Sequence, residues 1–207
     1  MSAADFAHPL REEDVDPSPF GQFKSWSEEA TRAGIRAPEA AALATATEDG
    51  APSVRMVLVK FADESGFVFY SNYESRKGRE LAANPRAALL FHWDALGRQV
   101  RIEGRVERTS SAESAAYVRS RERASQLSAL ASPQSRTIAS RSDLERLVAE
   151  LAAEHEGADL PVPDHWGGFR LNPKTFEFWQ HREDRLHDRL RYSRQGDGSW
   201  RLERLAP

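Results

Sequence analysis

A succession of short apolar or alternating segments, separated by turn residues, constrains the fold of this chain more than any other feature of its sequence. Three such segments follow one another at residues 40–47, 53–61 and 67–71. Asp49 and Gly50 lie between the first two. Short runs rich in β-branched and aromatic residues, bounded by Gly, Pro and Asp, are typical of strands. Because the connections are short, the sequence predicts an antiparallel meander.

The same pattern resumes after a short helical segment. Residues 75–84 predict a helix with Ser75 as its N-cap, and Pro85 follows its end. Further strands are predicted at residues 86–93, 98–109, 166–173, 175–180, 189–194 and 199–207, with turns at Asn172-Pro173 and Gly196-Asp197-Gly198. Since closure removes exposed strand edges, the sequence predicts a mainly β fold, an antiparallel barrel with helical insertions.

Helices are predicted at the N-terminal end and in the second half of the chain. Phe20, Phe23 and Trp26 recur at helical spacing. Residues 110–131 predict one or two helices, and residues 140–157 predict a longer amphipathic helix. We therefore expect an N-terminal arm with a short helix at residues 1–38, and a barrel domain at residues 39–207 with a helical insertion at about 110–157.

Composition excludes several classes of protein. The 207 residues include 29 Lys and Arg against 32 Asp and Glu, a formal net charge of −3, whereas general nucleic-acid binding favours a basic protein. Cysteine is absent, which excludes disulfides, thiolate metal ligands and a cysteine nucleophile. The six His lack a helical metal-ligand spacing, so we expect no metal. No apolar run approaches the ~20 residues that span a bilayer, and the acidic start does not resemble a secretory signal, so a cytoplasmic location is expected.

Basic residues at the ends of predicted elements suggest anion sites. Arg55 and Lys60 flank an apolar run, and their odd separation places them on opposite faces of the predicted strand. Arg76 and Lys77 open the predicted short helix, where free backbone N–H groups favour an anion such as phosphate. For Arg55 and Lys60, the alternative is that both side chains extend from the strand ends into solvent.

A second phosphate site is suggested within the predicted helical insertion. Tyr117, Arg121 and Ser125 follow one another at intervals of four residues, which places them on one face of a helix. Hydroxyl and guanidinium groups on one face can bind phosphate oxygens. The alternative is an ordinary solvated face, since Arg119 and Arg123 also lie in this segment.

Residues 176–189 hold the densest group of polar side chains in the sequence. Arg185, His187 and Arg189 alternate, so an extended strand would place all three on one face. Three potential cations beside a core are costly without an anionic partner. The alternative is an exposed edge strand that its charges protect from aggregation.

Several short blocks together resemble the pyridoxamine 5′-phosphate oxidase family. They are RMVLVK at 55–60, FYSN at 69–72, SRK at 75–77, PQS at 133–135 and FEFWQHREDRLHDR at 176–189. Their order and spacing agree with that family from about Pro17 to the terminal RLAP. The resemblance implies an FMN-binding split β-barrel that works as a homodimer, with active sites at the subunit interface.

The resemblance also implies an oxidase that converts pyridoxine 5′-phosphate or pyridoxamine 5′-phosphate to pyridoxal 5′-phosphate, with O2 as acceptor and H2O2 as product. By the same resemblance, FMN would be bound by Arg55, Met56, Val57, Leu58, Val59, Lys60, Tyr70, Ser71, Arg76, Lys77, Gln99, Gln134, Ser135, Trp179 and Arg189. The substrate would be bound by Lys60, Tyr117, Arg121, Ser125, Arg185 and His187. Of these, Arg185 and His187 would lie over the pyridine ring as the catalytic residues.

Two departures from the family pattern and two other functions are open at this point. His181 and Arg182 stand where family members commonly carry small residues, and the N-terminal arm has no clear counterpart of the Arg and Tyr with which some relatives close over the substrate. A related split-barrel flavin oxidase that acts on another aromatic substrate is one alternative function. A non-catalytic flavin or pyridoxal-phosphate carrier is the other.

Overall fold

The computed structural model describes residues 9–207, so residues 1–8 of the predicted N-terminal arm lie outside the described range. Its strands are β1 (Ala40–Ala46), β2 (Pro52–Asp63), β3 (Gly66–Asn72), β4 (Arg86–Trp93), β5 (Arg98–Arg108), β6 (Trp166–Gln180), β7 (Asp188–Arg194) and β8 (Trp200–Arg204). Its helices are α1 (Pro19–Arg32), α2 (Arg76–Ala83), the 3₁₀ helix η2 (Asp94–Leu96), α3 (Ser111–Ser120), α4 (Arg123–Ala131) and α5 (Arg141–Glu154).

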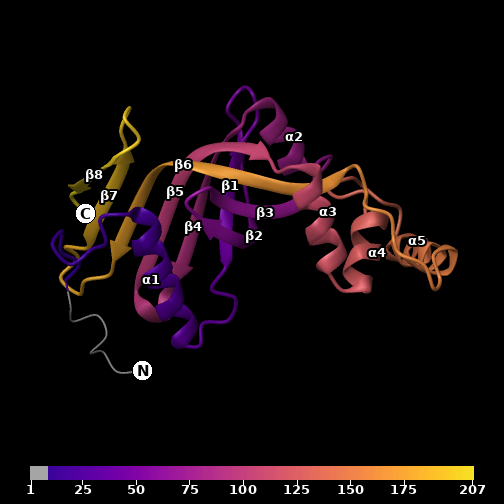
Figure 1. The fold of residues 1–207 in the computed structure, drawn as a ribbon, viewed down its shortest axis with the longest axis horizontal. Coiled ribbons are helices and arrows are strands. Elements are labelled where there is room, and N and C mark those ends of the chain that lie inside the picture. The colour runs from indigo at the N-terminus through magenta and orange to yellow at the C-terminus, as the bar shows by residue number, and fades with distance from the viewer. Residues whose placement is uncertain (1–8) are drawn as a thin grey trace.

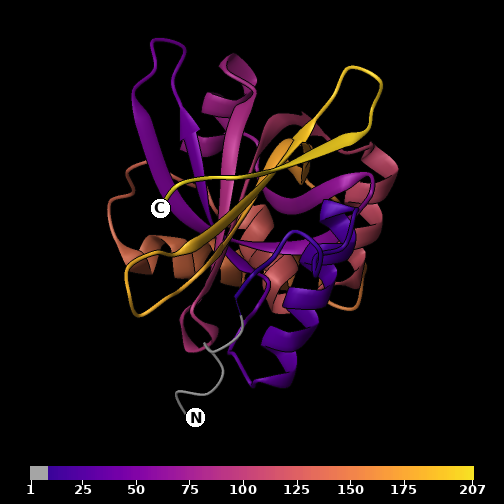
Figure 2. The same ribbon diagram turned by 90° about the vertical axis from the view of Figure 1, so that its left-hand side faces the viewer.

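Within this range the strands form one antiparallel sheet in the order β3-β2-β1-β4-β5-β6-β7-β8. An additional pairing of β3 with β6 closes the sheet from β3 to β6 into a barrel (Figure 1). β7 and β8 continue the sheet beyond the barrel as a hairpin, which projects from it in the view of Figure 2. The predicted antiparallel barrel with helical insertions is confirmed.

Inward-facing residues of the strands fill the barrel. In β1, for example, Ala41 and Leu43 are buried while their neighbours are partly exposed, as the two-residue period of a strand requires. The deeply buried large side chains include Phe67, Phe69, Phe91, Phe176 and Phe178. The predicted N-terminal helix is present as α1, and it adds Phe23 and Trp26 to the same core. The Trp26 ring lies 5.2 Å from that of Phe178.

The other helices lie outside the barrel. α2 connects β3 to β4 and begins as predicted, with the Ser75 hydroxyl accepting a hydrogen bond from the backbone N–H of Gly78. α3, α4 and α5 gather at the end of the molecule far from β7 and β8 (Figure 1). No residue of α5, the predicted amphipathic helix, is buried, and its Leu147 is 39% exposed. Across residues 9–207, every helix is too short or too polar to cross a membrane.

The predicted turn at Asn172-Pro173 is wrong, because β6 runs through both residues. Opposite them, the register of the β5–β6 ladder shifts between Glu103 and Gly104. This bulge accommodates Pro173, which has no N–H to donate to a regular ladder. Gly104 is needed at the bulge because a Cβ atom there would collide with the backbone of Asn172. As a result, β6 is one long strand.

The predicted single helical face of Tyr117, Arg121 and Ser125 is also wrong. α3 ends before Arg121, which has extended backbone angles (φ −79°, ψ 154°), and Ser125 lies on α4. Val118 on α3 and Leu127 on α4 are both buried. On one straight helix these two residues would point in opposite directions, since they are nine positions apart and nine steps turn a helix by about 900°. The break allows both to be buried.

Arg185, His187 and Arg189 do not share a strand, so the predicted alternation is wrong as well. β7 begins only at Asp188, and residues 181–187 form a loop. Arg185 has a φ of +67°, which a strand does not allow. Asp184 accepts a hydrogen bond of 2.9 Å from the N–H of Leu186. Such local side-chain bonds compete with strand pairing and favour a turn.

Candidate functional site

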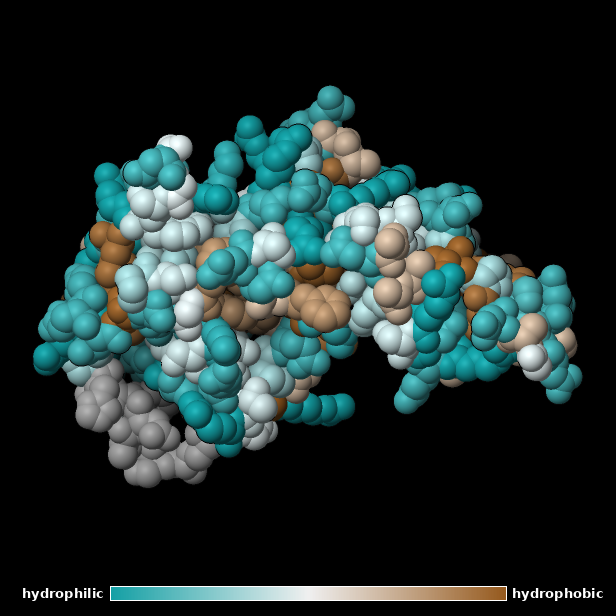
Figure 3. Space-filling view, in the orientation of Figure 1, coloured by the Kyte–Doolittle hydropathy of each residue, from teal (hydrophilic) through white to brown (hydrophobic). Residues whose placement is uncertain are grey.

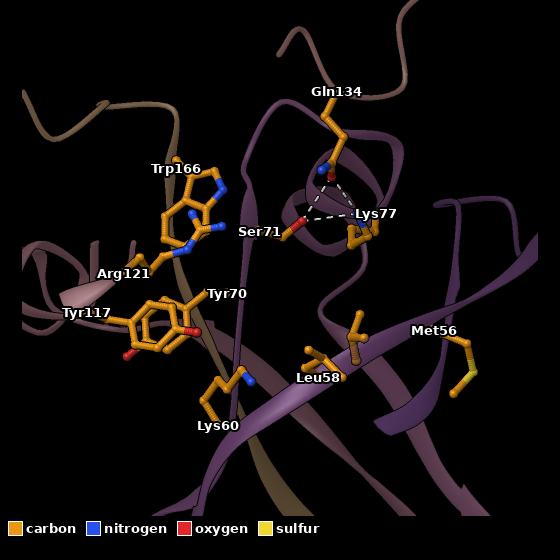
Figure 4. Close-up of a pocket in the computed structure, with 11 residues that line it drawn as sticks. Met56, Leu58, Lys60, Tyr70, Ser71, Lys77, Tyr117, Arg121, Gln134 and Trp166 are labelled. Carbon is orange, nitrogen blue, oxygen red and sulfur yellow. Dashed lines mark hydrogen bonds between the residues drawn. The ribbon is translucent and has the colours of Figure 1, made fainter. Parts of the chain in front are cut away.

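A cavity of about 240 Å³ lies beside β2, β3 and the helical insertion (Figure 4). It is lined by Met56, Val57, Leu58, Lys60, Tyr70, Ser71, Lys77, Tyr117, Arg121, Gln134 and Trp166. Every one of these residues except Trp166 is among the predicted FMN or substrate contacts. The fold therefore brings together side chains from β2, β3, α2, β6, the end of α3 and the loop at Gln134.

Lys77 lies at one side of this cavity, in the first turn of α2. Its ammonium group donates hydrogen bonds to the Ser71 hydroxyl at 3.0 Å and to Gln134 Oε1 at 2.7 Å, as Figure 4 shows. Burial, with a further contribution from the positive charge of Arg55, lowers the pKa of Lys77 to about 8. An anion in the cavity would offset both effects and favour the charged ammonium group.

Aromatic rings form the opposite side of the cavity. Tyr70 and Tyr117 are stacked, with ring centroids 3.7 Å apart and an interplanar angle of 12°. The ring of Trp166 is parallel to that of Tyr117 at 6.2 Å. Burial raises the pKa of both tyrosines, so their hydroxyl groups remain protonated near neutral pH. These rings offer flat apolar surfaces, and the hydroxyls offer hydrogen-bond donors.

Arg121 and Lys60 add positive charge to the cavity. The Arg121 guanidinium lies 4.7 Å from the centre of the Trp166 ring. Its Nη1 atom is buried and has no hydrogen-bond partner among the described residues. Leaving a charged N–H group buried and unpaired is costly, so this atom indicates a site for an anionic acceptor. The cavity lining within residues 9–207 includes no Asp or Glu that could supply one.

Arg55 and Arg76, both predicted FMN contacts, lie outside the cavity lining. Both donate to the buried carboxylate of Glu80, from Arg55 Nη2 at 3.2 Å and from Arg76 Nε at 2.8 Å. Lys60 instead approaches Glu39, with 3.7 Å between the ammonium nitrogen and Oε1. Arg55 is half-buried and Lys60 exposed, which confirms the prediction that they occupy opposite faces of β2.

Three other predicted residues are also absent from the cavity lining. The Val59 side chain is part of the barrel core and is 5% exposed. Ser125 lies on α4, beyond the break at Arg121. Ser135 follows Gln134 directly and is exposed, with a φ of +70°.

The remaining predicted residues, Gln99, Trp179, Arg185, His187 and Arg189, lie near one another elsewhere and are called the Trp179 group below. Gln99 on β5 is paired with Trp179 on β6, which is paired in turn with Arg189 on β7. The His187 ring lies 4.7 Å from the Trp179 ring. Arg189 donates to Glu177 Oε1 at 2.9 Å, and this hydrogen bond, with the charge of Glu177, raises the pKa of Arg189 against the opposing effect of burial.

His187 has a defined hydrogen bond at one ring nitrogen. The backbone N–H of Arg182 donates to His187 Nδ1 at 3.0 Å. Because Nδ1 accepts this bond, the proton of the neutral ring lies on Nε2. His187 therefore presents an N–H donor on the side of the ring away from Arg182.

The cavity and the Trp179 group lie at opposite ends of β6. Ser71 in the cavity wall is paired with Gly167, whereas Gln99 is paired with Trp179, twelve residues further along the strand. At ~3.3 Å per residue this corresponds to roughly 40 Å of strand. Figure 1 shows β6 crossing the barrel from the side of α3 to the side of β7. A single copy of the chain therefore does not bring both sets of residues to one small molecule.

Sequence reasoning missed Trp166, the first residue of β6, which is 8% exposed. The available signal was the pair of glycines after it. A Cβ atom on Gly167 would collide with Tyr73, and one on Gly168 would collide with Thr109. Two consecutive glycines in a predicted strand indicate a close approach of other groups, and this one brings α3 and Tyr117 against Trp166.

Comparison with known proteins identifies the family. The family model described as "Pyridoxamine 5'-phosphate oxidase" matches residues 27–155, more than half of the chain. The chain belongs to the pyridoxamine 5′-phosphate oxidase family. A second model, described as "Pyridoxine 5'-phosphate oxidase C-terminal dimerisation region", matches residues 166–207. This region contains β6, β7 and β8, and the match indicates that the chain forms a homodimer.

Relatives within the family are similar over nearly the whole chain. A protein of Rubrobacter xylanophilus named pyridoxine/pyridoxamine 5′-phosphate oxidase is 57% identical over 96% of this chain and 91% of its own length. One from Nostoc sp. PCC 7120 with the same name is 54% identical over 96% of this chain and 92% of its own. The crystal structure of PhzG from Burkholderia lata, in complex with tetrahydrophenazine-1-carboxylic acid, superposes with a TM-score of 0.90 at 36% identity and covers 96% of this chain and 98% of that one.

Proposed function

We propose that this protein is an FMN-dependent oxidase that converts pyridoxine 5′-phosphate or pyridoxamine 5′-phosphate to pyridoxal 5′-phosphate, with O2 as acceptor and H2O2 as product. The cavity carries the proposal, because it combines Lys60, Lys77 and the unpartnered Nη1 of Arg121 with stacked aromatic rings. Cations bind phosphate oxygens and flat rings bind a pyridine or flavin ring. The family relatives that carry this enzyme name support the same function.

The residues fit the two phosphorylated molecules that this reaction requires. Lys77, with Ser71 and Gln134, forms one group of donors at the start of α2. Arg121 and Tyr117 form a second group on the far side of the cavity. We assign the FMN phosphate to the Lys77 side of the cavity. Arg76 precedes Lys77 on α2, and the charge of Arg55 also acts on Lys77, although neither arginine lines the cavity. We assign the substrate phosphate to Arg121, Tyr117 and Lys60.

We further propose that each active site is shared between two copies of the chain. Beside the cavity, Val54, Met56 and Leu58 point outward from β2 and are 69%, 64% and 45% exposed. Figure 3 shows apolar side chains at the centre of this face of the molecule. Exposed apolar surface of this kind is typical of an interface. A second copy covering it would place its Trp179 group against the cavity.

The residues of the chain then have distinct roles in the reaction. FMN, when bound, would supply the oxidising chemistry, which is acceptance of a hydride equivalent from C4′ of the substrate and return of the electrons to O2. Arg121, Tyr117 and Lys60 anchor the substrate phosphate, and this remote binding energy fixes the position of C4′. We place Arg185 and His187 of the other copy over the pyridine ring. Since His187 Nδ1 accepts the N–H of Arg182, its Nε2–H would donate a hydrogen bond that orients the ring.

The proposal is tested with purified, FMN-loaded protein under air. Pyridoxine 5′-phosphate is added, and pyridoxal 5′-phosphate and hydrogen peroxide are followed together. We expect the two products in equal amounts. Bound FMN without turnover of either phosphorylated vitamer would contradict the proposal and favour a carrier of flavin or pyridoxal phosphate.

An oxidase acting on a reduced phenazine is a second candidate, favoured by the similarity to PhzG. Arg121 argues against it as the main activity. Its buried Nη1, which has no partner within residues 9–207, fits a phosphate better than an unphosphorylated ring system. Parallel assays with pyridoxine 5′-phosphate and with tetrahydrophenazine-1-carboxylic acid separate the two. A larger kcat/KM for the phenazine would assign the protein to this second function.

A further inference from the structure

Arg204, the last residue of β8, connects three segments that are far apart in the sequence. Its Nε and Nη2 atoms donate to the two carboxylate oxygens of Glu12, at 2.9 and 2.7 Å. Nη1 donates to Asp188 Oδ1 at 2.7 Å, and Nη2 also donates to the carbonyl oxygen of Leu10 at 2.7 Å. A guanidinium fork that satisfies two carboxylates at once is the strong form of an ion pair.

Asp188 is the point where this network meets the loop at residues 181–187. It is the first residue of β7 and directly follows His187. Its Oδ2 atom accepts the backbone N–H of Leu10 at 3.1 Å and lies 3.8 Å from Arg182 Nε. The side chain of Asp188 is only 13% exposed, so these bonds are shielded from solvent. The N-terminal arm is thus fixed to the base of the loop that carries Arg185 and His187.

The arm is held to the same strands at further points. Leu10 is 9% exposed and belongs to the barrel core. The hydroxyl of Tyr192, on β7, donates to the carbonyl oxygen of Asp16 at 2.6 Å. The segment from Leu10 to Asp16 therefore lies along β7 and β8 as an ordered part of the fold, called the strap below.

We propose that Arg204 is a positioning residue for the oxidase reaction: with Glu12 and Asp188 it fastens the strap to the loop at residues 181–187 and so fixes Arg185 and His187 over the substrate ring. This inference rests on the proposed function of the protein. Within the loop, backbone N–H groups donate from His181 to the Gly97 carbonyl, from Arg182 to His187 Nδ1 and from Leu186 to Asp184, and the network of Arg204 adds to these bonds a connection to the N-terminal arm.

The inference predicts a particular kinetic pattern. Among the described residues Arg204 bonds to Leu10, Glu12 and Asp188, none of which lines the cavity, so its replacement leaves the phosphate anchors intact. Substrate binding through the phosphate then persists, while the ring is held less accurately over the flavin. When the substrate ring is poorly oriented but the substrate phosphate is still bound, kcat falls and KM stays nearly unchanged.

The test uses the FMN-loaded dimer of three variants. Arg204→Gln removes the ion pairs with both Glu12 and Asp188, whereas Glu12→Gln removes only the ion pair between Arg204 and the N-terminal arm. Arg201→Gln is the matched control, because Arg201 is on the same strand and forms a single exposed ion pair with Glu203. We expect Arg204→Gln to lower kcat at least tenfold with KM for pyridoxine 5′-phosphate within twofold, and Glu12→Gln to lower kcat about threefold. Arg201→Gln should match the wild type.

Hydrogen exchange of residues 181–188 gives a readout independent of activity. We expect faster exchange of these amides in Arg204→Gln and Glu12→Gln, but not in Arg201→Gln. Wild-type kcat in both variants, or unchanged exchange of the loop, would overturn the inference. A wild-type protein that forms no pyridoxal 5′-phosphate would overturn the proposed function instead, and exchange would still decide whether the strap fixes the loop. If Arg204→Gln does not fold, the kcat and the hydrogen exchange of Glu12→Gln test the inference in its place.

Discussion

Burial makes the charge of Lys77 sensitive to pH in the range where enzymes are assayed. Its pKa is lowered to about 8 by burial and by the charge of Arg55, while Glu80 acts in the opposite direction. The cation that we assign to the FMN phosphate is therefore partly neutral in the empty cavity above that pH. Binding of a phosphate must then be coupled to uptake of a proton.

This coupling predicts that FMN affinity falls as pH rises. Because an anion raises the pKa of Lys77, the dissociation constant should increase by up to about tenfold per pH unit above pH 8. Quenching of flavin fluorescence measures it between pH 7 and pH 9. Lys77→Arg is the control, since a guanidinium remains charged throughout this range. Equal pH dependence in the wild type and the Arg variant would contradict the role given to Lys77.

Glu80 is a second residue whose environment determines its charge. Burial alone would raise its pKa, but hydrogen bonds from Ser53, Thr45, Arg76 and Arg55 more than offset this and lower the pKa to about 2. A depressed carboxylate pKa stabilises the folded state fully above its ordinary value, and that contribution is lost as pH falls toward the folded-state value.

We predict that Glu80→Gln lowers the free energy of unfolding by about 3 kcal/mol at pH 7, because it removes the buried carboxylate that pairs with the half-buried guanidinium group of Arg55 and with Arg76. The difference from the wild type should shrink as pH falls from 4.5 toward 2. Urea denaturation measures it. Glu74→Gln is the control, since Glu74 pairs with Arg136 where both side chains are about 60% exposed, and should cost less than ~1 kcal/mol. Equal effects of the two substitutions would contradict the role of Glu80.

At the scale of elements, the alternation of apolar residues predicted the strands well because burial on one face follows directly from local sequence. The predictions of secondary structure fail where contacts between distant residues determine the local conformation. The register shift that absorbs Pro173 depends on Gly104, a residue on another strand. The helix break at Arg121 depends on burying both Val118 and Leu127.

The candidate site shows the same division. The blocks around Arg55 and Arg121 could be found in the sequence because their residue types are characteristic of a phosphate site. Glu80 and Trp166 were missed, since their roles appear only when β2, α2 and β6 come together. The interval between Arg185 and Arg189 predicted a strand, but the turn at Asp184 and the positive φ of Arg185 place the former in a loop.

The backbone of the loop at residues 181–187 supports a prediction about Arg185. Its φ of +67° lies in the left-handed region, which costs an L-residue other than glycine about 1 kcal/mol. We expect Arg185→Gly to be about 1 kcal/mol more stable to denaturant than Arg185→Ala, although both lose turnover with pyridoxine 5′-phosphate. Urea denaturation and the oxidase assay measure the two effects. Equal stability would contradict this backbone conformation, and wild-type turnover in either variant would contradict the role of Arg185.

At the scale of the whole molecule, the length of β6 is the main reason for our proposal that the site is shared between two copies of the chain. One end of this strand lies beside the cavity and the other end carries Trp179. The outward face of β2 exposes Met56 and its apolar neighbours beside the cavity. The C-terminal dimerisation region contains β6 itself. The central claim is therefore that the cavity of one copy and the loop of the other form one active site.

Complementation between two inactive variants tests this claim most directly. Lys77→Met damages only the cavity, and Arg185→Ala damages only the loop. Co-expression with two different affinity tags allows the mixed dimer to be purified, and its formation of pyridoxal 5′-phosphate is compared with that of each parent homodimer. We predict about half of the wild-type turnover per dimer, since a two-fold dimer then contains one site with an intact cavity and an intact loop. A mixed dimer no more active than its inactive parents would contradict the shared site.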